Sequence, residues 1–320
     1  MNEYILEIKN LDMHFKNSLG DKIQILFNIN LSVKKGEFVG IIGESGSGKT
    51  QALMSILKLS PKNSIVNGSI FFKNKDLLKL DEDELNKIRG NYISIALQDV
   101  SLSLNPYMKV KEQLIEPLVL HYGKSKSDAE KEVIDVLNIL KIPNASKNIN
   151  KYPNEFSGGQ RQRFLIAMAL ICKPNIFLAD ELTTSLDLAT QLDVLNYIKK
   201  LKEETGMAVL FISHDIKMLS KYADKMVVMY CGHIIEEANK DDFLNNTMHP
   251  YSKGLIDLTP DLNSKNTKLK TIPGEIPQMK ELGKGCPFYN RCTRCVSKCI
   301  DCKANLEDIN GHKVACFNRL

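Results

Sequence analysis

One stretch of eight residues carries the chemistry of phosphate binding. Residues 43–50 read G-E-S-G-S-G-K-T, which fits the pattern G-x-x-x-x-G-K-[ST]. Small residues let successive backbone N–H groups approach a phosphate chain closely, and here they are Gly43, Ser45, Gly46 and Gly48. Lys49 supplies a positive charge for the β and γ phosphates, and the Thr50 hydroxyl suits the Mg²⁺ that bridges them. The stretch predicts a site for a nucleoside triphosphate with Mg²⁺.

Two acids and a histidine follow other predicted strands. Asp180 and Glu181 come directly after the apolar run 176–179, and His214 follows the apolar run 208–212. Ligands bind at the carboxyl ends of strands in a parallel sheet. There Asp180 could hold Mg²⁺ through water, Glu181 could accept a proton from the attacking water, and His214 could hydrogen-bond a γ phosphate. Taken singly, paired acids more often lie in a solvated loop, and such a histidine more often neighbours a helix N-cap.

A second glycine-containing stretch begins a helix. Ser157 is placed as an N-cap, and Gln160 completes the capping box S-x-x-Q. Gly158 and Gly159 directly after the cap weaken a helix unless the backbone must approach something closely. Amides at a helix start suit an anion, so we favour a second phosphate contact over a helix that is merely well capped.

The elements around these residues predict an α/β fold. Phe38 to Ile42 is a short buried strand and Lys49 to Leu59 a helix, so the phosphate loop lies between them. Alternating segments over residues 4–39 predict an antiparallel layer beside this core. Phe15 in that layer could stack on an adenine ring, although a lone aromatic residue is more often core.

Other local patterns predict the remaining elements. We expect a hairpin over 64–75, an acidic-capped helix over 81–89, a strand over 92–97 that ends at Gln98, mostly helix over 107–173, and a strand pair turning at 231–232. Ser127 and Glu130 fit a capping box for a helix that continues through the apolar positions 133–140. His233 is expected on the surface of the turn.

Composition limits the class of protein. The 320 residues are 43% hydrophobic and 25% charged, with a net charge of +5, which is ordinary for a globular protein. No apolar run reaches the roughly 18 to 20 residues that cross a bilayer, and the first eight residues do not resemble a signal peptide. We therefore expect a cytoplasmic protein. Its lysines are scattered rather than gathered in a basic stripe, which argues against nucleic-acid binding.

Six of the eight cysteines lie near the C-terminus, at Cys286, Cys292, Cys295, Cys299, Cys302 and Cys316. In a reducing cytoplasm such a group binds metal more often than it forms disulfides. The pairs at 292/295 and 299/302 have zinc-site spacing, and free thiols are another interpretation.

Six motifs, in this order, resemble the ATP-binding subunits of ABC transporters. They are the phosphate loop, a loop at Gln98, F-S-G-G-Q-R-Q-R from 156, F-L-A-D-E from 177, S-L-D at 185–187 and I-S-H-D from 212. The resemblance implies a P-loop NTPase (RecA-like) core with an antiparallel β layer and an inserted helical subdomain. It also implies a head-to-tail dimer in which Ser157 to Gln160 of one subunit close on the ATP of the other.

The same resemblance implies a role for each motif residue in ATP hydrolysis. Glu181 is the general base and His214 a γ-phosphate ligand. Gln98 senses the γ phosphate and the Mg²⁺ and contacts the membrane partner, and Asp187 bridges the two sites. Leu182 stands where the family usually has proline, and Phe156 where many members have leucine. The first departure affects the stiffness of the loop that places Glu181.

Later segments resemble the oligopeptide/dipeptide/nickel importer branch. They read S-L-S-L-N-P at 101–106, H-P-Y-S-K-G-L at 249–255, I-P-G-E-I-P at 272–277 and C-P-F-Y-N-R-C at 286–292. The cysteines that match this branch, where some members hold a [4Fe–4S] cluster, are Cys286, Cys292, Cys299 and Cys316. The resemblance implies a nucleotide-binding domain over 1–240, with a helical subdomain at about 99–173, and a Cys-rich extension over 241–320.

This branch also implies function and partners. The chain is expected to power peptide import across the cytoplasmic membrane, from its cytoplasmic side, with nickel import as the alternative and a soluble ABC ATPase as the less favoured one. The expected partners are two transmembrane permease subunits, a second, unlike ATP-binding subunit and, indirectly, an extracytoplasmic substrate-binding protein. The run A-M-A-L at 167–170 favours one of two unlike ATPase subunits.

Overall fold

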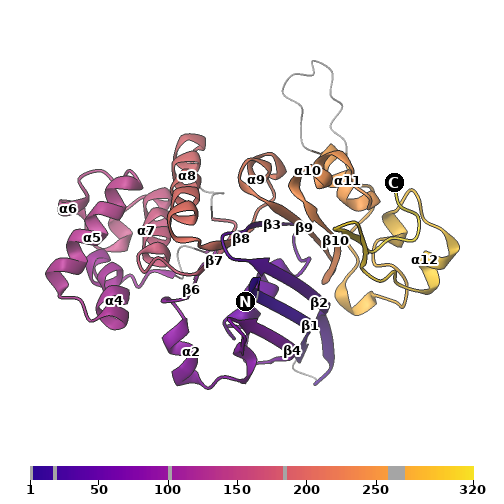
Figure 1. The fold of residues 1–320 in the computed structure, drawn as a ribbon, viewed down its shortest axis with the longest axis horizontal. Coiled ribbons are helices and arrows are strands. Elements are labelled where there is room, and N and C mark those ends of the chain that lie inside the picture. The colour runs from indigo at the N-terminus through magenta and orange to yellow at the C-terminus, as the bar shows by residue number, and fades with distance from the viewer. Residues whose placement is uncertain (1–2, 17–19, 100–102, 183–185, 259–270) are drawn as a thin grey trace, which may run out of the picture. The chain divides into compact units, whose positions relative to one another are not determined.

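The computed structural model describes residues 3–16, 20–99, 103–182, 186–258 and 271–320. The chain forms two compact units, one from residues 1–33, 38–78 and 212–320, the other from 34–37 and 79–211. Their elements are labelled in Figure 1. Parts of two motifs, residues 101–102 and 183–185, lie outside the described residues.

The first unit contains the expected antiparallel layer. Its four strands follow the order β2 (Lys22–Lys34), β1 (Tyr4–Lys16), β4 (Ser64–Phe72) and β5 (Lys75–Asp76). The hairpin over 64–75 is confirmed, since β4 and β5 pair antiparallel. Strand β2 is continuous over its 13 residues, although Asn28 within it takes a left-handed φ of 47°.

A second sheet in this unit holds the phosphate loop. Strand β3 (Phe38–Ile42) pairs parallel with β9 (Lys225–Tyr230), which pairs antiparallel with β10 (His233–Asn239). The extension adds β12 (His312–Val314) and β11 (Glu307–Ile309) beyond β10. The helices are α1 (Lys49–Ile56), α9 (Ile216–Tyr222), α10 (Lys240–Asn245), α11 (Pro250–Asp257) and α12 (Ser297–Asp301), with 3₁₀ turns at Met279–Glu281 and Tyr289–Arg291.

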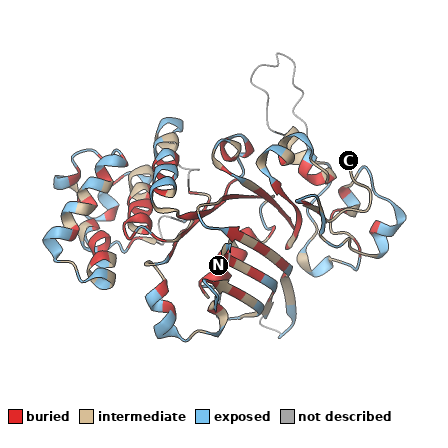
Figure 2. Ribbon diagram, in the orientation of Figure 1, coloured by how far each residue is buried: buried red, intermediate tan, exposed pale blue. Residues whose placement is uncertain are grey.

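The second unit carries the acidic strand and the helical region. Strands β8 (Ala208–Ile212), β7 (Ile176–Asp180) and β6 (Ile93–Ala96) lie in this order, with β6 and β7 parallel. The strands β3, β7 and β8 are buried along their whole length (Figure 2). The mostly helical stretch predicted over 107–173 is confirmed, since it contains α4 (Val110–Tyr122), α5 (Lys126–Ile139), α6 (Ala145–Asn148) and α7 (Gly158–Leu170), with a 3₁₀ turn at Pro153–Glu155. The other helices of this unit are α2 (Glu82–Ile88) and α8 (Leu188–Thr205).

The predicted capping box at Ser127 is wrong. Helix α5 begins two residues earlier than that box requires, and Ser125 is its N-cap, accepting a hydrogen bond from the Asp128 N–H at 3.2 Å. Ser125 and Asp128 also fit the pattern [ST]-x-x-[DE], so two boxes competed in the sequence. The helix uses the earlier one.

The prediction for His233 is also wrong, because the side chain packs inside the first unit. Its ring stacks on Phe27 with centroids 4.4 Å apart, and its Nδ1 lies 2.7 Å from the Cys231 carbonyl oxygen. Burial lowers the pKa of His233 from 6.5 to about 4. The turn at 231–232 is therefore covered by strand β2, where the Phe27 N–H donates to the Gly232 carbonyl at 2.9 Å.

This burial predicts acid sensitivity. Between pH 6.5 and 4 the unfolded chain binds a proton at His233 that the folded chain does not, so the free energy of unfolding falls as pH falls through that range. At pH 5 the loss amounts to about 2 kcal/mol. In His233→Phe the loss between pH 8 and pH 5, measured by denaturant unfolding, should be smaller by this amount. An equal loss in both proteins would contradict the prediction.

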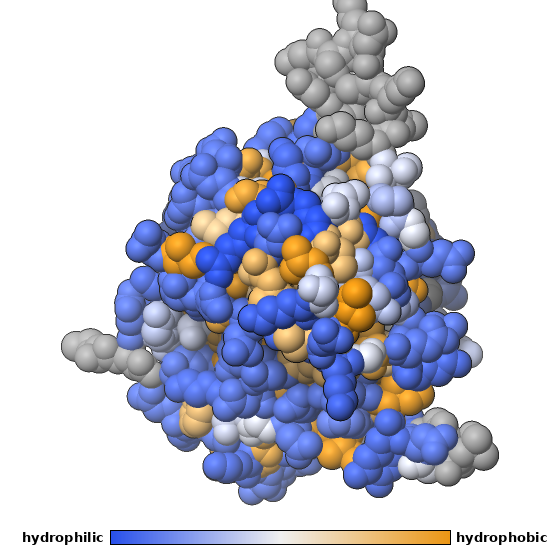
Figure 3. All heavy atoms as spheres, turned by 90° about the vertical axis from the view of Figure 1, so that its right-hand side faces the viewer, coloured by the Kyte–Doolittle hydropathy of each residue, from blue (hydrophilic) through white to orange (hydrophobic). Residues whose placement is uncertain are grey.

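Among the residues that the structure describes, no helix is both long enough and apolar enough to cross a membrane. On the face that carries the extension, apolar residues lie in separate groups among hydrophilic ones (Figure 3).

Candidate functional site

The phosphate loop joins β3 to α1 in a backbone shape that glycine allows. Gly43 has a φ of 151°, and a Cβ there would lie 2.2 Å from the Met229 carbonyl oxygen of β9. Gly46 has a φ of 77° with open space around it, so its glycine serves the turn and not a close contact. The buried Ser47 accepts the Gly232 N–H at 2.9 Å through its carbonyl. Contacts with β9 and the 231–232 turn therefore fix the loop.

Lys49 lies inside this loop, at the first position of α1. Only 7% of the residue is exposed, and its ammonium donates to the carbonyls of Gly43 at 2.8 Å and Glu44 at 2.9 Å. Thr50 follows in the same first turn. The start of a helix together with a held cation suits a phosphate group. The structure thus brings the predicted phosphate-binding residues of the first unit together.

The acidic half of the predicted site lies in the second unit. Asp180 is the buried last residue of β7, and Glu181 follows with a left-handed φ of 47°. The Gln98 side chain, two residues beyond β6, donates from Nε2 to the Glu181 carboxylate at 2.9 Å. The carboxyl ends of two parallel strands therefore bring Gln98 and Glu181 into contact.

The chain beyond Glu181 is held without the family's proline. Leu182 is fully buried, and its carbonyl accepts a hydrogen bond from the buried Gln162 side chain of α7. Burial and this hydrogen bond restrain the backbone where a proline ring would otherwise fix φ. Leu182 is thus anchored by packing in the second unit.

Ser157 and Asp187, which the family resemblance places at the dimer interface, are exposed N-caps of helices in the second unit. Ser157 Oγ accepts the Gln160 N–H at 3.3 Å, and the Ser157 N–H donates to Gln160 Oε1 at 3.2 Å, so the predicted capping box is confirmed. A Cβ on Gly158 would meet no atom within 4 Å, so this helix start is open. Asp187 caps α8, and hydrogen bonds from the backbone and hydroxyl of Thr190 lower the pKa of Asp187.

Two further predicted residues belong to the first unit. His214 is exposed, and its neighbour Asp215 is the residue that caps α9. Phe15 is half-buried near the end of β1, opposite Ser64 of β4. Neither contacts another predicted site residue through any interaction among those described, so their roles stay predictions.

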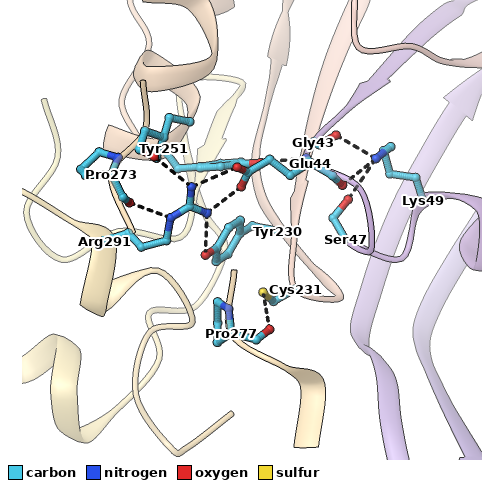
Figure 4. Close-up of polar contacts among 11 residues, drawn as sticks. Gly43, Glu44, Ser47, Lys49, Tyr230, Cys231, Tyr251, Pro273, Pro277 and Arg291 are labelled. Atoms are coloured by element: carbon cyan, nitrogen blue, oxygen red, sulfur yellow. Dashed lines mark hydrogen bonds and ion pairs between the residues drawn. The ribbon is translucent and has the colours of Figure 1, made fainter. Parts of the chain in front are cut away.

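Sequence reasoning missed an ion pair on the phosphate loop. The loop residue Glu44 is held by Arg291 of the extension, with Nη1 to Oε2 at 2.7 Å and Nη2 to Oε1 at 3.0 Å (Figure 4). The Tyr251 hydroxyl of α11 accepts the Glu44 N–H at 2.9 Å. The signal in the sequence was the arginine within C-P-F-Y-N-R-C, a stretch interpreted for its cysteines and for the family resemblance but not for this arginine.

The cysteines separate into two groups. Cys286, Cys292, Cys299 and Cys316 line one small cavity, whereas Cys295 is exposed and Cys302 does not line it. Burial raises the pKa of the Cys286 thiol to about 11, and charge on the other three thiols would add to this. Within the described ranges no group of three or more His, Cys, Asp or Glu side chains has the geometry to hold a metal ion. The described side chains therefore do not form a ready metal site, although four of the cysteines line the same cavity.

Comparisons with known proteins agree with the geometry. Residues 26–184 match the model of the family "ABC transporter", and residues 235–299 match "Oligopeptide/dipeptide transporter, C-terminal region". The chain is 41% identical over 313 residues to the oligopeptide transport ATP-binding protein OppD of Escherichia coli K12, covering 98% of this chain and 93% of that protein. It is 42% identical over 295 residues to OppD of Haemophilus influenzae, covering 92% and 91%.

Solved structures show the same fold. The dimeric ATP-binding cassette MJ0796, bound to ADP and Pi, superposes with a TM-score of 0.67 at 33% identity, covering 73% of this chain and 98% of that one. The predicted P-loop NTPase fold is thereby confirmed. Near-complete coverage of the relatives, together with both family matches, identifies the chain: it belongs to the ATP-binding subunits of ABC transporters, in the branch that carries the oligopeptide/dipeptide transporter C-terminal region.

Proposed function

We propose that this ABC ATPase powers the import of di- and oligopeptides across the cytoplasmic membrane. The match of residues 235–299 to the oligopeptide/dipeptide C-terminal region carries this proposal, because that region lies outside the ATPase motifs. Relatives named for oligopeptide transport, at about 40% identity over nearly the whole chain, support it further. The nucleotide-binding domain spans 1–240, with a helical subdomain at about 99–173, and the extension spans 241–320.

The reaction would follow from the residues already placed. Lys49 and the loop amides would hold the triphosphate, and Phe15 would stack on the adenine. Thr50, Gln98 and Asp180 would hold Mg²⁺, which would supply positive charge to the phosphates.

At the γ phosphate, Glu181 takes a proton from the attacking water, so that ATP and water give ADP and phosphate, while His214 contacts the γ phosphate and Gln98 senses it. The contact of Gln98 with the Glu181 carboxylate, at 2.9 Å, supports their acting on the same water.

Assembly would follow the ABC scheme. Ser157 to Gln160 of one subunit close on the ATP of another, and Asp187 bridges the two sites. The open helix start at Gly158 supports this role, since a partner's phosphate could approach it. The proposed partners are an unlike ATP-binding subunit, two permease subunits and, through them, an extracytoplasmic binding protein. The chain would be peripheral on the cytoplasmic side of the membrane.

An anaerobic pull-down of the tagged chain from native membranes tests the proposal. We expect two multi-span proteins and a second ATPase to copurify, and the reconstituted complex to take up labelled peptides when ATP is present. Uptake of Ni²⁺ instead of peptides would show that the alternative cargo, nickel, is the correct one. Recovery of the chain only in the soluble fraction, with ribosomes or nucleic acid, would overturn the transport function.

We also propose that Cys286, Cys292, Cys299 and Cys316 hold a [4Fe–4S] cluster. Their gathering around one cavity supports the choice of these four over Cys295 and Cys302. The cluster would cross-link segments of the short extension and so stabilise its fold, and each iron would offset the charge of its thiolates.

Iron analysis of two variants checks this assignment. Cys286→Ser should lose most of the iron and lower the melting temperature, whereas Cys302→Ser should keep both near the values of the unmodified chain. If the unmodified chain contains zinc instead of iron, and Cys302→Ser also loses that zinc, the result would favour the zinc site formed by the pairs 292/295 and 299/302. Unchanged iron content in Cys286→Ser would contradict the proposal that these four cysteines hold a cluster.

A further inference from the structure

The Glu44 side chain is held by a residue that lies 247 positions away along the chain. The two terminal guanidinium nitrogens of Arg291, Nη1 and Nη2, donate to the Glu44 carboxylate at 2.7 and 3.0 Å. The Arg291 side chain is 4% exposed and that of Glu44 is 25% exposed, so water screens this pair only weakly. Figure 4 shows the guanidinium aimed at the carboxylate from the side of the extension.

Arg291 itself is fixed by the extension and by β9. Its Nε donates to the Pro273 carbonyl at 2.9 Å, and Nη1 donates to the Tyr230 hydroxyl at 3.2 Å. The guanidinium lies 5.8 Å from the ring centroids of both Tyr230 and Phe288. Because the planar fork is held at each of its nitrogens, it can present only one orientation to Glu44.

Glu44 in turn connects this arginine to the residues that bind phosphate. Its carbonyl accepts a hydrogen bond from the Lys49 ammonium at 2.9 Å, and its N–H donates to Tyr251 at 2.9 Å. The side chain, the N–H and the carbonyl of this one residue are therefore each held by a different element. Movement of Arg291 would change the backbone that surrounds Lys49.

Charge gives Arg291 a second effect on the loop. A free carboxylate in a loop that binds a triphosphate would repel the nucleotide, and partial burial would strengthen that repulsion. Pairing with a guanidinium cancels most of this field at the loop.

We propose that Arg291 is a positioning residue for nucleotide binding, which neutralises and orients Glu44 so that the C-terminal extension sets the affinity of the phosphate loop for ATP. The inference rests on the assignment of this loop as the ATP site.

The test measures dissociation constants of MgATP and MgADP for the full chain by displacement of a fluorescent nucleotide. In Arg291→Met the Kd for ATP should rise about tenfold and that for ADP should rise less, because ADP carries less charge. Adding Glu44→Gln to Arg291→Met should restore the Kd for ATP to within about threefold of the starting value. Such rescue is not expected if Arg291 only supports the fold.

Two further variants keep the test decisive. Arg291→Gln keeps one hydrogen-bond donor, at the level of the Nε that binds the Pro273 carbonyl, but loses the charge. The same rise and the same rescue are therefore expected if the methionine variant does not fold. Arg294→Met, which removes the exposed arginine that binds Asn318 and Arg319, should leave both dissociation constants unchanged.

An unaltered Kd in both Arg291 variants, or a rise that Glu44→Gln does not reverse, would overturn the proposal. Failure of the unmodified chain to bind ATP would instead remove the assignment of the loop.

Discussion

Replacing Glu181 by glutamine should lower the ATP turnover of the assembled complex by roughly 10²- to 10⁴-fold, the usual contribution of a general base. The amide cannot accept the proton of the attacking water, although it keeps the size of the side chain and one oxygen for the 2.9 Å contact with Gln98. ATP binding should remain, because the variant keeps Lys49 and the amides of the phosphate loop. The variant complex should therefore accumulate in its ATP-bound form.

Phosphate release and nucleotide retention, measured on the same sample, separate these two effects. Glu203→Gln is the matched control, since Glu203 is an exposed acid of α8 that pairs with Lys199 at 4.0 Å and should not affect turnover. Equal turnover in Glu181→Gln and the unmodified complex would show that another group acts as the base. Loss of ATP binding in this variant would assign Glu181 a structural role.

Lys49→Met should raise the Kd for ATP about 100-fold. The ammonium is the one side-chain cation within the phosphate loop 43–50, and charged hydrogen bonds of this kind contribute about 3 kcal/mol together. The variant also loses the two bonds to the carbonyls of Gly43 and Glu44 that hold the loop around the ammonium. Affinity and loop order should therefore fall together.

Isothermal titration with MgATP measures this change. Lys62→Met removes an exposed lysine shortly after α1 and should bind ATP as the unmodified chain does. ATP affinity that falls equally in the two variants would indicate a general effect of charge. Affinity that is unchanged in Lys49→Met would mean that the loop amides alone hold the phosphates.

The elements of the core could be predicted because their signals are local. The runs 38–42 and 208–212 are apolar along their whole length and end at polar residues, and the structure reproduces both as strands β3 and β8 with these bounds. The sequence also placed Gln98 and Glu181 at the ends of two predicted strands. The structure shows that these strands are parallel neighbours, whose carboxyl ends meet at one edge and bring the two side chains into contact. The capping box of Ser157 followed from four consecutive residues.

Predictions failed where two local patterns competed or where packing decided. Ser125 and Ser127 both fit the pattern of a helix N-cap, and only the structure shows that α5 begins after Ser125. His233 belongs to a tight turn, which is usually exposed, yet Phe27 from a distant strand covers it. The effect of Leu182 on loop stiffness was open from the sequence, and only the structure shows that burial and the Gln162 side chain anchor this residue.

The sequence by itself determined the family and predicted which residues carry out ATP hydrolysis, because phosphate binding and proton transfer need particular residue types at fixed short spacings. Only the tertiary structure decided how the loop is supported. The pair between Arg291 and Glu44 joins residues 247 positions apart, and neither residue shows periodicity or a motif that refers to the other. Such a pair forms because folding brings β9, α11 and the extension to the phosphate loop, and a buried arginine then requires a carboxylate partner.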